Sequence, residues 1–193
     1  MADAGKPLPL GASLTETGVN FALFSRNAVA VTLIIFESPA PDSPYEEILL
    51  DRRKNRTGDI WHCHIRGLGA GTQYLYRADG PYMPAKGFRF NRYKTLLDPY
   101  AKALTDLSGW DMAASTGYNA DGLSNDLSFS CRDDIRSKPR CIVVDDAFDW
   151  QGDIPLNYPL RFSVLYETHV RGLTRNPNSG AKYPGTYRGV VEK

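Results

Sequence analysis

The run Val29-Ala30-Val31-Thr32-Leu33-Ile34-Ile35-Phe36 predicts a β-strand, because it is rich in β-branched and apolar residues. Other short apolar runs lie on either side of it, and clusters of Gly, Pro, Asn and Asp separate them. Short strands at this spacing, with no helical period between them, are typical of an all-β sandwich of roughly 100 residues. Further strands are predicted at residues 19–23, 47–50, 60–65 and 72–79.

The composition changes after Asp79 and divides the chain into three parts. Residues 1–107 hold the predicted sandwich, in which Asp98 can cap a short helical turn starting at Pro99. Residues 108–140 are rich in Ser, Asp, Asn and Gly, and we interpret them as a connecting surface loop. Residues 141–193 form the third part, in which 161–170 is typical of a strand. Such a strand needs neighbours for its backbone groups, and the Gly-, Pro- and Asn-rich residues after it do not supply them.

The charge balance of the chain limits its partners. The 193 residues include 23 Lys+Arg and 22 Asp+Glu, a formal net charge of +1. This balance argues against nucleic acid or an anionic membrane as the main partner, since both require clustered positive charge. No apolar run approaches the roughly 20 residues of a membrane span, and the N-terminus lacks the order of a signal peptide. The three cysteines form no paired motif, which fits a reducing compartment, so we expect a cytoplasmic protein of undefined oligomeric state.

The short motifs do not indicate catalysis. Gly67-x-Gly69-x-Gly71 is followed by a Tyr-rich strand instead of the helix that a phosphate loop requires, so a turn is expected. On a strand, His62 and His64 share one face while Cys63 faces the other, so no metal site is expected and no cofactor is predicted. Adjacent acidic pairs such as Asp133-Asp134 diverge along an extended chain and do not form a glycosidase pair. We therefore assign no catalytic residue.

The aromatic residues point to sugars, because the flat faces of sugar rings stack on aromatic side chains. Trp61, Tyr74 and Tyr76 are the candidates for α-glucan binding in the predicted sandwich, with Asn20, Gln73 and Arg77 as polar neighbours that fix orientation. The same rings also suit the sandwich core, and the spacing leaves both interpretations open. Five more aromatic residues follow within a short span: Tyr82, Phe88, Phe90, Tyr93 and Tyr100.

Seven strings, in order along the chain, carry a family resemblance. They are Gly18–Ser25, Trp61-His62, Tyr74-x-Tyr76-Arg77-x-Asp79-Gly80-Pro81, Phe88–Asn91, Leu97–Ala101, Val164–Thr174 and Gly185–Gly189. Together they closely resemble the N-terminal region of bacterial glycogen debranching enzymes of the isoamylase type, in the α-amylase superfamily. The resemblance covers nearly the whole chain.

The resemblance implies an immunoglobulin-like β-sandwich of the starch- and glycogen-binding type, followed by the start of a (β/α)8 glycoside hydrolase barrel. Residues 164–170 would be the first barrel strand. Tyr166 on it joins the candidate substrate-binding residues, and barrel packing is the alternative role for residues of this strand. The family hydrolyses α-1,6 branch linkages of glycogen with an Asp nucleophile, a Glu acid/base and a further Asp, all on later strands. A barrel takes about 250 residues, so residues 141–193 are expected to supply only its incomplete start. We expect an N-terminal fragment that at most binds α-glucan, and its own enzymatic status stays open.

Two alternatives remain. The chain can be a non-catalytic module or scaffold whose sandwich packs against another chain, or a fragment of a glycogen branching enzyme or a trehalose-forming hydrolase. Calorimetric titration with maltoheptaose or glycogen separates the first from a glucan-binding module. The segment after about Cys141 is expected to exchange amide hydrogens readily, or to pair with another chain, because residues 164–170 lack barrel neighbours.

Overall fold

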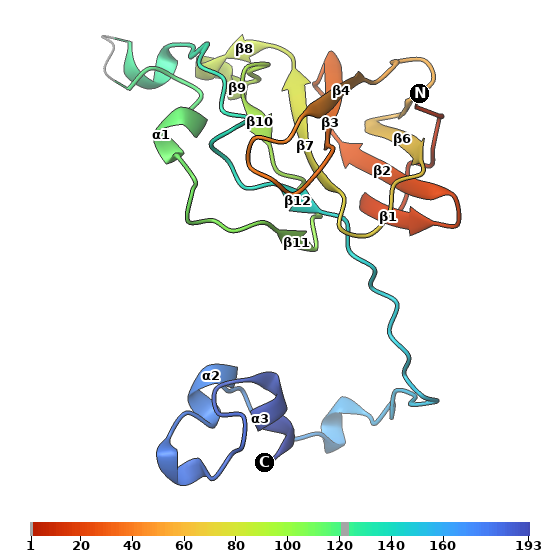
Figure 1. Cartoon of the computed structure of the whole chain (residues 1–193), viewed down its shortest axis with the longest axis vertical. Helices are drawn as coiled ribbons and strands as arrows, with labels where there is room; N and C mark the ends of the chain where they lie inside the picture. Colours follow the sequence, from red (N-terminus) through yellow and green to blue (C-terminus); the bar gives the residue numbers. More distant parts are fainter. Residues whose placement is uncertain (1, 121–123) are drawn as a thin grey trace. The chain divides into compact units, whose positions relative to one another are not determined.

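The computed structural model describes residues 2–120 and 124–193, and the chain falls into two compact units, Met1–Ala147 and Phe148–Lys193 (Figure 1). The first unit is mainly β and holds all the strands of the described residues. The predicted boundaries at residues 107 and 140 differ from this division, since the first unit continues to Ala147. Within the described residues, no helix has the length and apolar character needed to cross a bilayer.

One antiparallel sheet of the first unit has four strands, in the order β1-β2-β6-β5. Its elements are β1 (Gly11–Thr15), β2 (Gly18–Phe24), β6 (Ile60–Arg66) and β5 (Arg56–Thr57). β2 and β6 pair along their full length, with Phe21 opposite Cys63. Gly18 permits this pairing, because a Cβ there would lie 2.1 Å from the Ile65 carbonyl oxygen.

The second sheet has the order β11-β12-β7-β3-β4, and β10 also pairs with β7. Its elements are β3 (Ala30–Phe36), β4 (Tyr45–Leu49), β7 (Gln73–Asp79), β10 (Thr95–Leu96), β11 (Ala103–Leu104) and β12 (Cys141–Ile142). β3 is the β-branched run, and it pairs with β7 over seven residues from Ala30 opposite Asp79 to Phe36 opposite Gln73. The five strands predicted between residues 19 and 79 are confirmed, and the glycine-rich run 67–71 is the expected turn between β6 and β7.

The two sheets share one core between their facing sides. The Phe21 ring of β2 meets the Tyr74 ring of β7 edge to face, with centroids 5.1 Å apart, and Tyr76 packs edge to face on Tyr74 at 5.8 Å. Trp61 from β6 is 1% exposed, and its Nε1 donates to the Ser25 carbonyl at 3.1 Å. This arrangement is a β-sandwich whose largest core side chains are aromatic.

The segment 108–140 is not the surface connection that its composition predicts. Ile135 is 6% exposed and belongs to the main hydrophobic cluster, while the Arg140 guanidinium lies 3.6 Å from the centroid of the Phe36 ring. Phe36 and Gln73 face each other across β3 and β7, and Arg140 Nη1 also donates to Gln73 Oε1 at 3.1 Å. This segment therefore covers part of the six-stranded sheet and belongs to the first unit.

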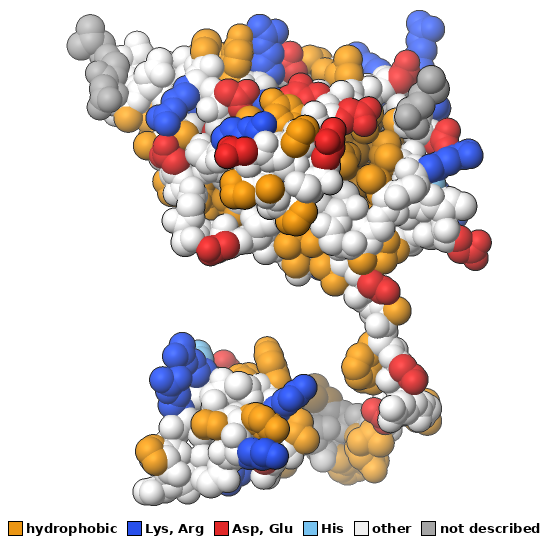
Figure 2. Space-filling view, viewed as in Figure 1, with side chains coloured by type: hydrophobic (Ala, Val, Ile, Leu, Met, Phe, Trp, Pro, Cys, Tyr) orange, Lys and Arg blue, Asp and Glu red, His pale blue; other side chains and the backbone are white. Residues whose placement is uncertain are grey.

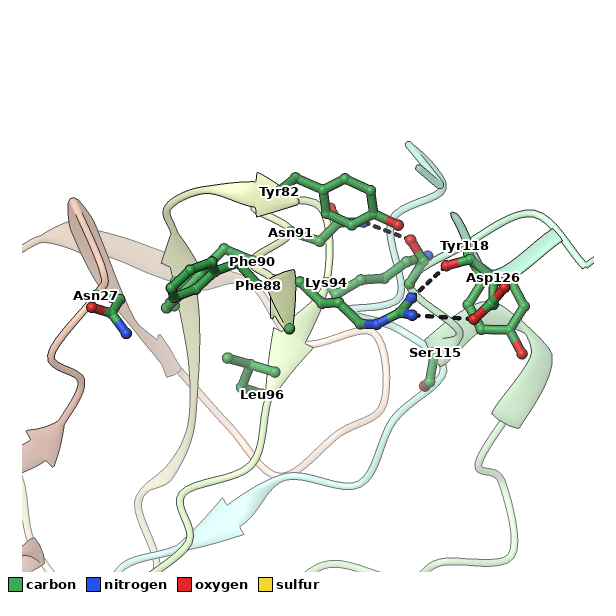
Figure 3. A pocket seen from close by; sticks show the side chains of 14 residues that line it. Asn27, Tyr82, Phe88, Phe90, Asn91, Lys94, Leu96, Ser115, Tyr118 and Asp126 are labelled. Carbon is green, nitrogen blue, oxygen red and sulfur yellow. Dashed lines mark hydrogen bonds and ion pairs between the residues drawn. The ribbon is translucent and has the colours of Figure 1, made fainter. Parts of the chain in front are cut away.

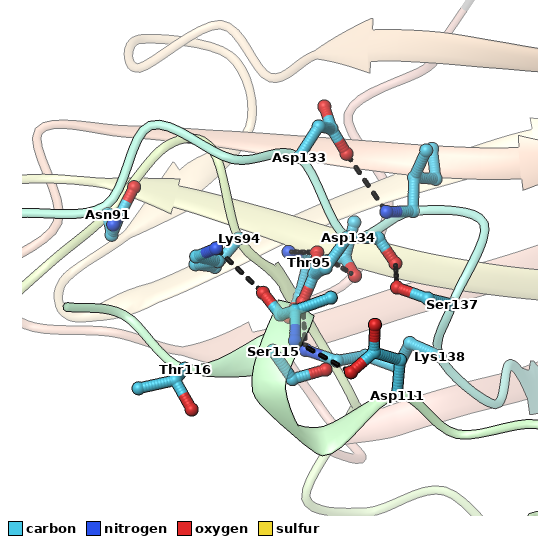
Figure 4. Close-up of polar contacts among 12 residues, drawn as sticks. Asn91, Lys94, Thr95, Asp111, Ser115, Thr116, Asp133, Asp134, Ser137 and Lys138 are labelled. Atoms are coloured by element: carbon cyan, nitrogen blue, oxygen red, sulfur yellow. Dashed lines mark hydrogen bonds and ion pairs between the residues drawn. The ribbon is translucent and has the colours of Figure 1, made fainter. Parts of the chain in front are cut away.

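A buried polar cluster fastens this cover to β10 (Figure 4). Asp134 Oδ1 accepts from the Thr95 amide at 2.7 Å and from the Thr95 hydroxyl at 2.8 Å, and Asp134 Oδ2 pairs with Lys138 Nζ at 2.8 Å. Lys94 Nζ donates to the carbonyls of Ala114 and Arg132 at 2.7 and 2.6 Å. Ala114 lies on the short helix α1 (Met112–Ser115), so one lysine joins two parts of the cover.

Asp98 forms the predicted cap, but no helix follows it. Asp98 Oδ1 accepts from the Tyr100 amide at 2.8 Å, and the Ala101 amide closes a single turn on the Asp98 carbonyl at 3.0 Å. The other carboxylate oxygen accepts from the Tyr74 hydroxyl at 2.8 Å inside the protein. Asp98 therefore ties the turn to the sandwich core.

The second unit contains only short helices: η3 (Leu160–Phe162), α2 (Val170–Leu173), η4 (Pro177–Ser179) and α3 (Tyr187–Val191). Thr174 is fully buried, and its hydroxyl oxygen accepts from the Gly185 amide at 2.8 Å. The predicted strand at residues 164–170 is wrong for this chain: Val164 is 96% exposed, and no strand partner pairs with the segment among the described residues. Without a neighbouring strand, the extended backbone gains no ladder of hydrogen bonds.

Candidate functional site

Three of the four residues predicted to bind substrate lie inside the protein. Trp61, Tyr74 and Tyr76 are 1%, 0% and 1% exposed, so their rings present no face to a sugar in solution. Their interpretation as stacking residues is wrong, and the alternative interpretation as core residues holds. Tyr166 is 81% exposed and lies in the second unit, where it does not line the cleft formed by Trp150 and residues 153–156.

The proposed orienting residues are also structural. Asn20 Oδ1 accepts from the Lys6 amide at 2.7 Å, and Asn20 Nδ2 donates to the Lys6 carbonyl at 3.0 Å. Arg77 pairs with Glu47 at 3.2 Å and with Asp133 at 2.8 Å. These side chains hold the N-terminal segment and the 108–140 cover in place.

A cleft of the first unit has a volume of about 770 Å³ and lies beside the hairpin β8–β9 (Figure 3). β8 (Tyr82–Met83) and β9 (Phe88–Arg89) are joined through η1 (Pro84–Lys86). Half-buried aromatic side chains form much of the cleft wall, and polar side chains stand among them. The aromatic lining residues are Tyr82, Phe88, Phe90 and Tyr118, and the polar ones are Asn27, Arg89, Asn91, Lys94, Ser115 and Asp126.

The local backbone explains where these rings lie. Gly80 directly follows β7. A Cβ at this position would lie 2.7 Å from the Phe90 ring, so only glycine leaves room for that ring. Tyr82 packs edge to face on Phe129 with centroids 4.7 Å apart, and its hydroxyl donates to the Ser128 carbonyl. Figure 3 shows Phe88 and Phe90 on one side of the cleft and Tyr118 with Asp126 on the other.

Polar contacts shape the floor and one end of the cleft. Arg89 Nη2 donates to Asp126 Oδ2 at 3.1 Å, which joins β9 to η2 (Asn125–Leu127). Asn91 Nδ2 donates to the Ser130 carbonyl at 2.8 Å, and both Asn91 and Lys94 are less than a tenth exposed. Burial lowers the pKa of the Lys94 ammonium, while the charge of Asp134 partly opposes this shift.

This chemistry suits binding. Asp126 is the one carboxylate among the described lining residues, and it is engaged by Arg89, whereas glycoside hydrolysis needs two facing carboxyl groups. Aromatic faces among fixed polar groups match a flat sugar ring with hydroxyls at its edge. Among residues 2–120 and 124–193, no group of three His, Cys, Asp or Glu side chains is placed to hold a metal ion.

Sequence reasoning found part of this cleft. Tyr82, Phe88 and Phe90 were among the aromatic residues noted in the sequence, but Tyr118, Ser115 and Asp126 come from the segment interpreted as a loop. A usable signal for Ser115 lies in Asp111, which precedes α1 and caps it by accepting from the Ala114 amide at 2.9 Å.

Comparison with known proteins places this domain in a family. Residues 9–101 match the family described as carbohydrate-binding module 48 (isoamylase N-terminal domain). A glycogen debranching enzyme of Yersinia enterocolitica is 39% identical over 189 residues, which are 97% of this chain and 26% of that enzyme. The chloroplastic isoamylase 1 of Arabidopsis thaliana is 37% identical over 193 residues, 98% of this chain and 23% of that protein. The chain thus spans about a quarter of the length of the curated relatives it matches.

Solved structures share the fold at lower identity. The glycogen-degrading pneumococcal virulence factor SpuA matches with a TM-score of 0.61 at 22% identity, over 98% of this chain and 18% of that one. A pullulanase of Paenibacillus barengoltzii, in complex with maltohexaose and α-cyclodextrin, matches with a TM-score of 0.59 at 22% identity, over 98% of this chain and 24% of that one. Residues 9–101 therefore belong to the carbohydrate-binding module 48 family, and the chain corresponds to the N-terminal portion of glycogen debranching enzymes and isoamylases.

Proposed function

We propose that this chain binds α-glucan through the cleft beside β8–β9. The observation that carries the proposal is the aromatic cleft itself, because it lies in a domain of a carbohydrate-binding family and offers several half-buried rings. Maltohexaose in the complex of the Paenibacillus pullulanase is a ligand of the same chemical class.

Ring stacking supplies most of the expected affinity. Phe88 and Tyr118 can each cover one sugar face, while the Arg89 guanidinium and the Asn27 amide can meet hydroxyls at the ring edge. Loss of one well-placed aromatic anchor costs on the order of 1–3 kcal/mol, which weakens binding by roughly 5- to 150-fold. Binding to a short oligosaccharide is expected to be weak, since few rings contribute.

Isothermal titration of the full chain with maltoheptaose tests the proposal. Wild-type protein should release saturable heat, and Phe88→Ala and Tyr118→Ala should each weaken binding. Phe24→Ala is the matched control, because Phe24 is 52% exposed on β2 and does not line the cleft. Absence of heat from wild-type protein with an intact near-UV circular dichroism spectrum would reject glucan binding.

We further propose that the chain serves a longer protein that hydrolyses α-1,6 branch linkages of glycogen. The identity to glycogen debranching enzymes across nearly the whole chain supports this role. In such a protein, residues 164–170 would form the first strand of the hydrolase barrel. The cysteines support a reducing, cytoplasmic setting, since Cys63, Cys131 and Cys141 all carry free thiols.

A protein-packing role is the second candidate, and one observation favours it. Apolar side chains are exposed along residues 148–166, among them Trp150 at 65%, Leu156 at 76% and Leu165 at 83%, and Figure 2 shows hydrophobic side chains along this part of the chain. Exposed apolar surface of this kind marks a site of packing against protein. Hydrogen exchange separates the outcomes: residues 164–170 should exchange readily in the isolated chain and become protected when another polypeptide pairs with them.

A further inference from the structure

A second cleft of the first unit has a different chemistry. It encloses about 410 Å³ between the 37–44 loop and residues 136–140, and three cationic side chains line it: Arg136, Lys138 and Arg140. Thr105 and Ser108 supply hydroxyl groups on another wall. None of these residues lines the aromatic cleft beside β8–β9.

The two arginines converge on one neutral oxygen atom. The Pro41 carbonyl accepts from Arg136 Nη1 at 3.2 Å and from Arg140 Nη2 at 2.5 Å. Arg136 Nη1 also donates to the Ser43 carbonyl at 2.7 Å, and Arg140 Nη1 to the Ala40 carbonyl at 3.1 Å. Carbonyl oxygens satisfy these donors, but they do not cancel two adjacent positive charges.

The positive charges of Arg136 and Arg140 have no carboxylate partner among the described residues. Neither arginine forms an ion pair with any residue in the part of the chain that the structure describes, whereas Lys138 pairs with Asp134 at 2.8 Å. Asp106 lines the cleft, but its two oxygens accept from the Ser108 amide at 3.0 Å and the Ser108 hydroxyl at 2.5 Å.

Asp42, an exposed residue of the 37–44 loop, acts on Arg140 through its charge without a hydrogen bond. Arg140 is 5% exposed, so solvent screens its charge weakly. Burial and the neighbouring charge of Arg136 both lower the pKa of Arg140, which agrees with two cations held close together.

We propose that this second cleft binds a phosphate-sized dianion, either inorganic phosphate or the phosphoryl group of a hexose phosphate. Guanidinium N–H donors match phosphate oxygens. Arg136 can supply such donors, because only its Nη1 is engaged among the described residues, by the Pro41 and Ser43 carbonyls. Arg140, whose Nη1 and Nη2 are already occupied, adds its positive charge. The volume of the cleft leaves room for a sugar beside the anion. Arg136 is the adjustable member of the pair, because it is exposed, whereas Arg140 is fixed by the Phe36 ring and four carbonyl or amide oxygens.

The test is an NMR titration of the full chain at constant ionic strength, followed at the Ser108 and Gly109 amides. Inorganic phosphate and glucose 6-phosphate should each cause saturable shifts, and neutral glucose should cause none. Arg136→Gln should weaken phosphate binding about tenfold or more, because one charge-assisted contact is lost. Arg66→Gln is the matched control, since Arg66 is an exposed arginine on β6, in the other sheet, and forms an ion pair with Asp3.

The two sources of the anion give different results. Equal affinity for phosphate and glucose 6-phosphate identifies a site for the free anion, and tighter binding of glucose 6-phosphate identifies a sugar phosphate site. Absence of saturable shifts, or equal phosphate affinity of Arg136→Gln and wild-type protein, would overturn the proposal. A further test needs only the wild-type protein. Sulfate should compete with phosphate for the cleft, and failure to compete would also overturn the proposal.

Discussion

Replacing Lys94 by methionine tests whether one buried ammonium group holds the 108–140 cover and the wall of the aromatic cleft. Lys94 is 4% exposed, and methionine keeps most of its aliphatic volume while removing the charge. The substitution leaves two acceptors without their donor. They are the buried Ala114 carbonyl, 2.7 Å from Lys94 Nζ, and the partly buried Arg132 carbonyl, 2.6 Å from it.

The magnitude follows from these contacts. A buried acceptor left without a donor costs about 1–3 kcal/mol, and the more accessible Arg132 carbonyl regains water and loses less. Burial disfavours the charged ammonium, as its lowered pKa indicates. Removing the charge therefore offsets part of the stability lost with the hydrogen bonds. The expected net loss in the free energy of unfolding is about 2 kcal/mol.

Urea denaturation at neutral pH measures this loss, and hydrogen exchange at residues 112–115 and 130–135 locates it. Lys102→Met is the control, because Lys102 forms an ion pair with Asp146 in which both side chains are largely exposed. Exposed pairs contribute about 0–1 kcal/mol. Equal stability of the Lys94→Met and Lys102→Met proteins, with unchanged exchange in both segments, would refute the assigned role of Lys94.

Three further predictions concern the core, the unit boundary and the buried carboxyl group. Ile135→Ala should cost about 2–4 kcal/mol in urea denaturation, whereas Leu127→Ala, at a position 58% exposed, should change stability little; equal losses would contradict the cover. A chain ending at Ala147 should keep the near-UV circular dichroism of the first unit, while one ending at residue 107 should lose it. Burial raises the pKa of Asp98 above 3.8. Between 3.8 and that raised value the folded state alone keeps the proton, so stability should fall as pH rises through this window, and Asp98→Asn should remove that part of the dependence.

The sandwich could be predicted from the sequence because strand signals are local. β-branched runs and the turns between them define β3, β6 and β7 without knowledge of what packs on them. The face of the sheet to which a ring points is not determined by local sequence. Successive residues of a strand point to opposite faces, and either face can be the buried one. Tyr74 and Tyr76 point into the core because the other sheet lies there and Phe21 meets Tyr74, and nothing in the alternation itself makes that choice.

The cover was missed because it buries little apolar surface of its own. Ile135 is the one residue of this segment in the hydrophobic cluster of the described residues. Arg140 lies over Phe36 and Arg136 over Tyr45, so the stems and guanidinium planes of charged residues replace aliphatic side chains. A segment built this way has the composition of a surface loop, and its packing depends on the aromatic rings beneath it.

Residues 164–170 show the opposite error of prediction: their sequence predicts a strand strongly, and the structure has none there. A pattern of apolar and β-branched residues predicts a strand only where other strands are available to pair with it. β12 shows that a very short segment forms a strand when such partners are present. β12 has only Cys141 and Ile142, yet it pairs with both β7 and β11. Val164, Leu165 and Tyr166 have the longer pattern and no partner strand among the described residues, and they stay exposed. Strand formation at this position is therefore decided by what lies beside the segment, and a polypeptide that supplies an edge should convert it without any change in its sequence.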